Sequence, residues 1–223
     1  MRRFAYLLLF FCLILFQSCF EIIEQVFLKN DGSGNFQLVL NLSKSKTKLN
    51  SIIKMETING HEVPSKADIK YRIADIEKTV AKTPGLTNVK TTVDFDNFIA
   101  TLTCNFYKVT QLNAAIKNVY EKENGKLKGV EKTYDYDAAT QTFTRYNKFS
   151  VKDDYKKLSN ADKEIFATAN YTSIYKFESS VVAASNKGTQ ISPSKKAAML
   201  QQNALDLITE KKTVENKITL TKQ

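Results

Sequence analysis

Alternating apolar and polar residues mark a series of strands along this chain. Residues 20–28 form a strand pattern, a turn follows at Asn30–Gly34, and residues 36–42 alternate again, which together predict a hairpin with one buried face. Two further hairpins are predicted, by residues 89–95 with 98–107 and by residues 130–136 with 142–151. Single strands are expected at 171–177 and 215–221.

Apolar residues at three- and four-residue spacing predict three helices between these strands. The first begins at Ser65 in a capping-box pattern and ends before Pro84-Gly85. Its apolar stripe consists of Ile69, Ile73, Ile76 and Val80. The second helix follows Thr110 and ends at Gly125, and a third, at 159–168, is expected to turn Ile165 and Phe166 inward.

Two segments fit more than one structure. Residues 44–55 fit either a short helix or an irregular cover over the sheet. Residues 195–211 fit either a helix or a strand at 197–200 followed by a helical turn at 205–208. Hairpins alternate with one or two helices, without the strand-helix-strand rhythm of a parallel sheet. The predicted fold class is therefore α+β, an antiparallel sheet built from hairpins with helices packed on one face.

The first residues form an export signal. Arg2 and Arg3 precede an unbroken apolar run from Phe4 to Phe16. A membrane-spanning helix needs about 20 such residues, so this run is too short to span and fits the apolar core of a secretory signal. The run ends in Leu15-Phe16-Gln17-Ser18-Cys19, which resembles the lipobox of bacterial lipoproteins. The resemblance implies cleavage before Cys19 and acylation of its thiol and of the new amine.

This processing divides the chain into a signal peptide at 1–18 and a single α+β domain at 19–223. A strand begins directly after Cys19, so the domain is expected to lie close to the bilayer. Cys12 leaves with the signal and Cys19 carries lipid, which leaves Cys104 without a disulfide partner in the chain. Alternation over residues 100–106 places Cys104 on a buried face, as a small core residue.

No group of residues predicts catalysis, a metal site or a cofactor. His61 is the sole histidine and lies in a polar loop, whereas a zinc site needs several His or Cys ligands and a nucleophile needs a positioned base. The aspartates that a paired-acid glycosidase would need fall mainly at strand ends and turns. They are Asp94, Asp96, Asp135, Asp137, Asp153 and Asp154. We therefore expect no enzyme, with a hydrolase as the least favoured alternative.

The chain is basic and rich in tyrosine. Lys and Arg number 33 against 23 Asp and Glu, a formal net charge of +10. Export argues against a nucleic-acid partner, so the lysines predict either contact with anionic lipid head groups or simply a solvated surface. Five tyrosines fall in predicted strands, where they fit cross-strand aromatic pairs or, less simply, the lining of a groove for glycan or lipid. These are Tyr134, Tyr136, Tyr146, Tyr171 and Tyr175.

A resemblance to known proteins rests on the first quarter of the chain. Cys19-Phe20-Glu21-Ile22, followed by Asp31-Gly32-Ser33-Gly34 and Asn41-Leu42-Ser43, resembles uncharacterised Bacteroidota lipoproteins. More distantly it is similar to the LppM-like lipoprotein domain, in which a Cys is followed by a strand, an Asp-Gly turn and a second strand. The resemblance implies an envelope domain, with lipid or glycolipid binding as a possible activity, and no site residue to carry over.

Together these features predict a non-enzymatic lipoprotein of the cell envelope. Acyl chains on Cys19 would anchor it in the outer membrane, with the periplasmic face favoured over the cell surface. Its domain is expected to bind an envelope lipid, a glycolipid or a protein partner. The alternative is an accessory subunit of an envelope complex.

Overall fold

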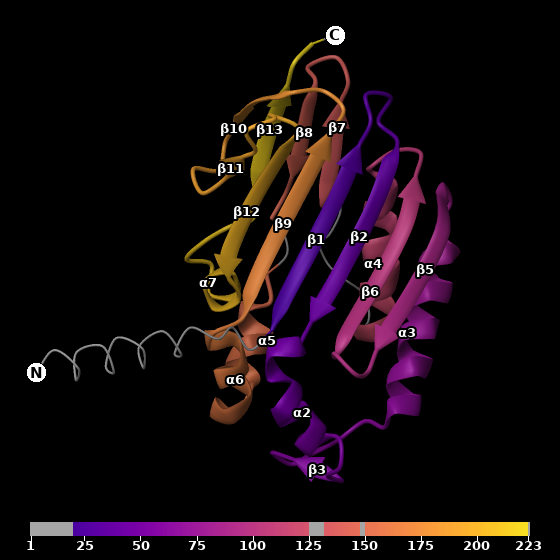
Figure 1. Ribbon diagram of the computed structural model, residues 1–223, viewed down its shortest axis with the longest axis vertical. Helices are drawn as coiled ribbons and strands as arrows, with labels where there is room; N and C mark the ends of the chain where they lie inside the picture. The colour runs from indigo at the N-terminus through magenta and orange to yellow at the C-terminus, as the bar shows by residue number, and fades with distance from the viewer. Residues whose placement is uncertain (1–19, 125–131, 148–149, 223) are drawn as a thin grey trace, which may run out of the picture.

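A seven-stranded sheet forms the front of the computed structural model, which describes residues 20–124, 132–147 and 150–222 (Figure 1). In spatial order its strands are β11 (Gln190–Ile191), β12 (Ala197–Asn203), β9 (Asn170–Phe177), β1 (Glu21–Leu28), β2 (Gly34–Asn41), β6 (Ile99–Phe106) and β5 (Leu86–Asp94). Neighbouring strands are antiparallel except β1 and β9, which run parallel. Period-2 alternation divides each strand between an inner and an outer face. On β1 the inner residues are Glu24, Val26 and Leu28.

A smaller four-stranded sheet packs against the inner face of the large one. Its order is β10 (Val181–Ala184), β13 (Asn216–Leu220), β8 (Thr142–Arg145) and β7 (Tyr134–Asp137). Phe143 of β8 joins the two sheets, since its ring centroid lies 4.8 Å from that of Tyr175 and 5.7 Å from that of Phe177, both on β9. A separate hairpin consists of β3 (Thr57–Ile58) and β4 (His61–Glu62).

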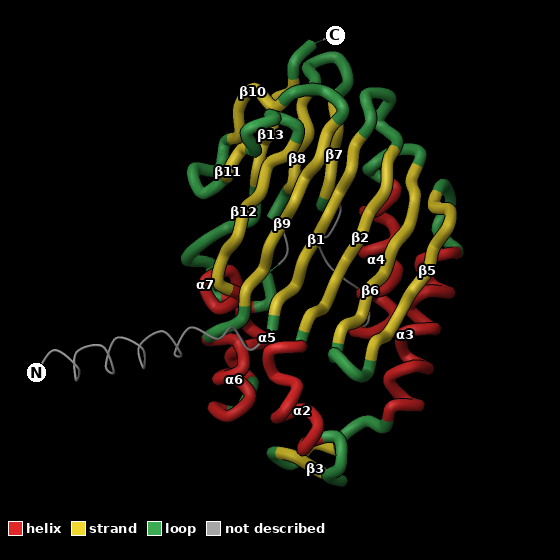
Figure 2. The backbone as a smooth tube through the Cα atoms, in the orientation of Figure 1, coloured by secondary structure: helices red, strands yellow, loops and turns green. Residues whose placement is uncertain are grey.

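Helices cover the rest of the inner face and one end of the sheets (Figure 2). They are η1 (Ser43–Ser45), α2 (Lys46–Ile52), α3 (Lys66–Ala81), α4 (Gln111–Asn124), α5 (Lys152–Lys157), α6 (Asn160–Ala167) and α7 (Ala204–Ile208). Both α3 and α4 lie behind β5 and β6, where they contact each other. The α+β class, with a mainly antiparallel sheet and helices packed against it, is confirmed.

Local signals set most of these elements correctly. Ser65 caps α3 through the predicted capping box: its hydroxyl accepts a hydrogen bond from the backbone N–H of Asp68 at 3.1 Å, and the Asp68 carboxylate accepts one from the N–H of Ser65 at 3.0 Å. Of the two structures that 44–55 fitted, the short helix is observed, as η1 and α2 over residues 43–52. Of the two structures that 195–211 fitted, the strand followed by a helical turn is the one observed.

Other expectations were wrong or incomplete. Ile165 of α6 is not inward-facing but 42% exposed, whereas Phe166 packs edge-on against Phe20 at 5.9 Å between ring centroids. The third hairpin is shorter than predicted, because only residues 134–137 and 142–145 pair. Residues 130–131 and 148–149 of that prediction, and Gly125 at the predicted end of the second helix, lie outside the described residues.

Candidate functional site

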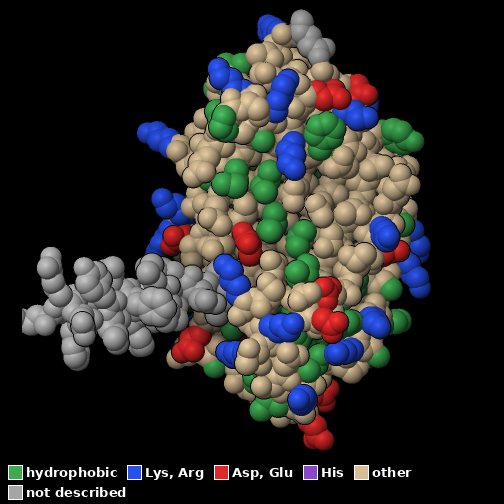
Figure 3. All heavy atoms as spheres, in the orientation of Figure 1, with side chains coloured by type: hydrophobic (Ala, Val, Ile, Leu, Met, Phe, Trp, Pro, Cys, Tyr) green, Lys and Arg blue, Asp and Glu red, His purple; other side chains and the backbone are tan. Residues whose placement is uncertain are grey.

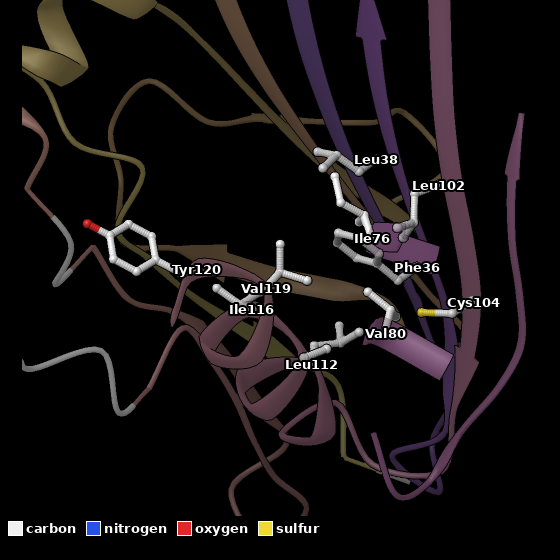
Figure 4. A pocket seen from close by; sticks show the side chains of 11 residues that line it. Phe36, Leu38, Ile76, Val80, Leu102, Cys104, Leu112, Ile116, Val119 and Tyr120 are labelled. Atoms are coloured by element: carbon white, nitrogen blue, oxygen red, sulfur yellow. The ribbon is translucent and has the colours of Figure 1, made fainter. Parts of the chain in front are cut away.

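An apolar cavity of about 340 Å³ lies between the inner face of the large sheet and helices α3 and α4 (Figure 4). Phe36 and Leu38 of β2 form its floor together with Leu102 and Cys104 of β6. The two helices contribute Ile76, Val80, Leu112, Ala115, Ile116, Val119 and Tyr120. Among the described lining residues, only Tyr120 and Cys104 carry a polar side-chain group, a phenol and a thiol, so the cavity suits an apolar ligand.

Simple periodicities place these side chains together. The antiparallel register of β2 and β6 sets Phe36 opposite Cys104 and Leu38 opposite Leu102 on the same face of the sheet. On α4, Leu112, Ile116 and Val119 follow three- and four-residue spacing, which keeps them on the side that faces the sheet. The cavity is what remains where the two apolar faces do not fully interdigitate.

The cavity floor becomes more exposed toward one end of the molecule. Along β2, Phe36 is 9% exposed, Leu38 37% and Leu40 38%. The inner face of β1 shows the same gradient, from Leu28 and Val26, each 1% exposed, to the partly exposed Ile22. The inner face is therefore closed near the β1–β2 turn and opens toward the end at which β1 begins.

A second cavity, also of about 340 Å³, adjoins the first and adds a polar wall. The two share four lining residues, Phe36, Leu38, Ile116 and Tyr120. The second cavity also has a polar or charged set comprising Glu24, Lys132, Thr133, Tyr134, Arg145, Tyr146, Asn147 and Tyr171. The two cavities form one groove with an apolar part and a polar part.

A buried ion pair dominates the polar part. Arg145 of β8 holds Glu24 of β1 in a bidentate fork, with Nε to Oε1 and Nη2 to Oε2 both at 3.1 Å. The phenol of Tyr175 donates to Oε1 at 2.7 Å, and that of Tyr171 donates to Oε2. The guanidinium also donates to the carbonyl oxygen of Tyr146 and lies 5.1 Å from the ring centroid of Tyr134. The pair thus links the two sheets.

The pair leaves the polar part close to neutral. Burial works to raise the pKa of Glu24, but the charge of Arg145 and the hydrogen bonds from Arg145, Tyr171 and Tyr175 together hold it below its ordinary value, so the carboxylate stays ionised. Lys132, the other cation of the lining, lies 2.6 Å from the carboxylate of Asp135. Because both cations of the described lining have an acidic partner, these residues offer hydrogen bonds without a large positive field.

Acid is expected to destabilise the fold through Glu24. The folded-state pKa lies below the ordinary value of 4.5, so the stabilisation is fully present above that value and is lost as pH falls through the folded-state pKa. Urea unfolding at a series of pH values checks this. A Glu24→Gln/Arg145→Met double variant, which lacks the titrating group, should lose less stability in acid, and an equal loss would contradict the assignment.

The residues singled out from the sequence do not converge on one site. Cys19, the predicted lipidation site, lies outside the described residues. Cys104 is 2% exposed on the cavity floor, and burial raises the pKa of its thiol to about 11, so it is protonated at neutral pH. His61 lies on β4, with its ring 70% exposed and Nε2 3.4 Å from Asp162 of α6. Within the described ranges, no group of three or more His, Cys, Asp or Glu side chains is placed to hold a metal ion.

Two of the aspartates close turns, as their positions predicted. Asp94 accepts hydrogen bonds from the backbone of Asp96 and Asn97, each at 2.9 Å, and Asp137 accepts one from Ala139 at 2.9 Å. Glu24 is the single acid in the lining of the two cavities described above. The described residues of the lining therefore do not include a pair of acids for glycoside hydrolysis.

The predicted cross-strand aromatic pairing is observed at Tyr134, and three of the five tyrosines line the groove. Tyr134 packs on Phe143 of the neighbouring strand at 6.3 Å, and it also lines the groove with Tyr146 and Tyr171. The sequence reasoning missed Glu24 and Arg145 as partners. A signal was present, because Glu24 interrupts the apolar inner positions Ile22, Val26 and Leu28. An acid on a buried face requires a partner, but its position in the sequence does not identify one.

No protein-family model and no curated protein matches this chain. Among solved structures, the fold is similar to the NMR structure of the folded domain of LppM from Mycobacterium tuberculosis. The identity is 9%, the match covers 92% of this chain and 90% of that chain, and the TM-score is 0.41. A likeness at this level carries no argument about function, which must come from the groove itself.

Proposed function

We propose that this protein is a lipid-anchored protein of the bacterial envelope whose domain binds the acyl chain of a lipid. The observation that carries the proposal is the apolar cavity of about 340 Å³ between the sheet and helices α3 and α4. Ligand pockets usually measure about 300–1,000 Å³ and are lined mainly by apolar side chains. An occupant would remove the exposed apolar surface of Leu38 from water.

The polar part of the groove favours an uncharged head group. Arg145 is committed to Glu24 and Lys132 to Asp135, so neither cation is available to balance an anion. Thr133 and Asn147 supply neutral hydrogen-bonding groups beside the apolar cavity. We therefore expect an acyl ester or hydroxyl at this end of the ligand, in preference to a free carboxylate or a phosphate.

The envelope assignment rests on the N-terminal pattern. A short apolar signal followed by Ser18-Cys19 supports export, cleavage and acylation, and the outer membrane is the proposed destination. In the part of the chain that the structure describes, none of the helices has the length and apolarity to cross a bilayer. In this proposal the acyl chains on Cys19 supply the attachment.

A fluorescent acyl probe tests ligand binding. The purified full-length protein in detergent is titrated with cis-parinaric acid and with its methyl ester, whose emission rises in an apolar site. Both should bind, and the ester at least as tightly as the acid. In Leu38→Trp the larger side chain occupies the cavity floor, so binding should weaken at least 10-fold, equivalent to about 1.4 kcal/mol.

Val39→Trp is the matched control. Val39 is the next residue of β2 and faces the outer side of the sheet, so the same substitution there should leave binding unchanged. Val119→Trp fills the same cavity from helix α4, and so tests the same site if Leu38→Trp disturbs the sheet. Each variant is first shown to unfold as cooperatively as the unmodified protein. Equal probe binding by all three variants would contradict the cavity as the binding site. Organic extraction and mass spectrometry of the purified protein would then identify any natural occupant.

A further inference from the structure

The segment that carries η1 and α2 is basic and partly apolar. Residues 43–55 contain Lys44, Lys46, Lys48 and Lys54 and no acidic residue, and all four lysines are exposed. None of the four forms a salt bridge with a described residue. Its apolar residues Leu49, Ile52 and Ile53 are partly buried, whereas Met55 is 52% exposed.

The neighbouring helices do not share this charge. Residues 152–164, which include α5 and α6, hold four lysines but also Asp153, Asp154, Asp162 and Glu164. Two of these lysines are paired within one turn, Lys156 with Asp153 at 2.7 Å and Lys157 with Asp154 at 2.8 Å. Among the described residues, four lysines without a salt bridge are therefore a property of the 43–55 segment and not of α5 and α6; the charge of Asp94 acts on Lys46 from outside salt-bridge distance. Several Lys and Arg side chains are visible over the lower end in Figure 3.

The segment lies at the end of the sheet where the anchor must emerge. Glu21, the first residue of β1, pairs with Asn41, the last residue of β2, and the chain continues from Asn41 directly into η1. Cys19 is two residues before Glu21, so their Cα atoms are at most about 7 Å apart. In Figure 1, α2 extends beyond this end of the strands. Acyl chains on Cys19 would thus hold the segment close to the bilayer surface.

We infer that residues 43–55 contact an anionic bilayer, with the lysines at the phospholipid head groups and Met55 at the interface. This inference rests on the proposed acyl anchor at Cys19. Each lysine near an anionic surface adds attraction that falls off within a Debye length. The contact would turn the open end of the groove toward the membrane, since the cavity floor becomes more exposed in that direction. A lipid could then pass between the bilayer and the groove without crossing water.

Site-directed fluorescence in reconstituted vesicles tests the contact. Mature acylated protein carrying Met55→Cys is labelled with an environment-sensitive dye; Cys12 has left with the signal, Cys19 is acylated and Cys104 is only 2% exposed, so the label is specific. The emission should shift to the blue on phosphatidylcholine vesicles containing phosphatidylglycerol, and not on phosphatidylcholine alone. A label at Val182→Cys, which is 60% exposed on β10 at the opposite end, should not shift on either.

Charge removal completes the test. The triple variant Lys44→Ala/Lys46→Ala/Lys48→Ala should lower the ratio of membrane-bound to unbound 43–55 segment by about 100-fold and abolish the blue shift. A control that removes three lysines elsewhere, Lys187→Ala/Lys195→Ala/Lys222→Ala, should retain it. An unshifted Met55 label on anionic vesicles, or equal shifts on both vesicle types, would overturn the inference. Such a result would leave the proposed ligand site intact, because parinaric acid binding in detergent does not depend on the membrane contact. A mature chain without acyl groups would instead overturn both the membrane contact and the anchor.

Discussion

Cys19→Ala is expected to leave the protein uncleaved or mislocalised and without attached lipid. Each buried methylene of an acyl chain contributes about 0.8 kcal/mol, so two or three chains make attachment effectively permanent and their loss should be complete in a fractionation experiment. Palmitate labelling and the intact mass of the purified protein report the modification directly. Membrane fractionation after a high-salt wash reports the anchor.

Cys12→Ala is the control for this result. Cys12 lies in the apolar run that processing would remove, so its loss should change neither labelling nor fractionation. Normal labelling and normal membrane retention of Cys19→Ala would refute the lipidation assignment. Loss of labelling in both variants would instead indicate that the signal itself had been damaged, and an apolar Cys12→Leu replacement would then resolve the two effects.

Arg145→Met is expected to cost about 3–5 kcal/mol of unfolding free energy, because it leaves the Glu24 carboxylate buried without its cation. Glu24 is 3% exposed, so water cannot replace the lost partner. Urea unfolding at neutral pH measures the loss. In this variant burial is no longer opposed by the guanidinium, so the folded-state pKa of Glu24 should rise and stability should improve as pH falls, the reverse of the native behaviour.

The double variant Glu24→Gln/Arg145→Met should recover much of this loss, since a neutral amide can still accept hydrogen bonds from Tyr171 and Tyr175. Lys157→Met breaks an exposed pair with Asp154 and should cause no measurable change. If Arg145→Met were as stable as Lys157→Met, the Glu24–Arg145 pair would not be the desolvated link between the sheets that its geometry indicates.

The elements that short-range signals specify were predicted well. Alternation identified β1, β2, β5 and β6, and the capping box at Ser65 with Asp68 identified the start of α3. Ile165 was misplaced because the facing of a short helix is not determined by its own sequence: Phe166 takes the inward position beside Phe20 and Tyr155. The parallel pairing of β1 with β9 and the second sheet gave no local signal.

The groove was predictable only in part. Each of its apolar faces could be seen as a stripe, on β2, on α3 and on α4, and the tyrosines were recognised as candidates for a lining. That these stripes leave a cavity depends on how closely the helices approach the sheet, which no periodicity reports. The partner of Glu24 lies 121 residues away in the chain, so only the crossing of the two sheets brings Arg145 to it.

The amino-acid order alone predicts the export signal and the acyl site at Cys19 and specifies the α+β class and the face of each strand that is buried, because each of these depends on neighbours within a few residues. Which strands become neighbours, where the apolar faces fail to close, and how a buried acid is neutralised depend on contacts between residues far apart in the chain, as in the pairing of Glu24 with Ser173 across β1 and β9. Many chain paths satisfy the same hydrophobic pattern, and the packing of all the elements together selects one of them.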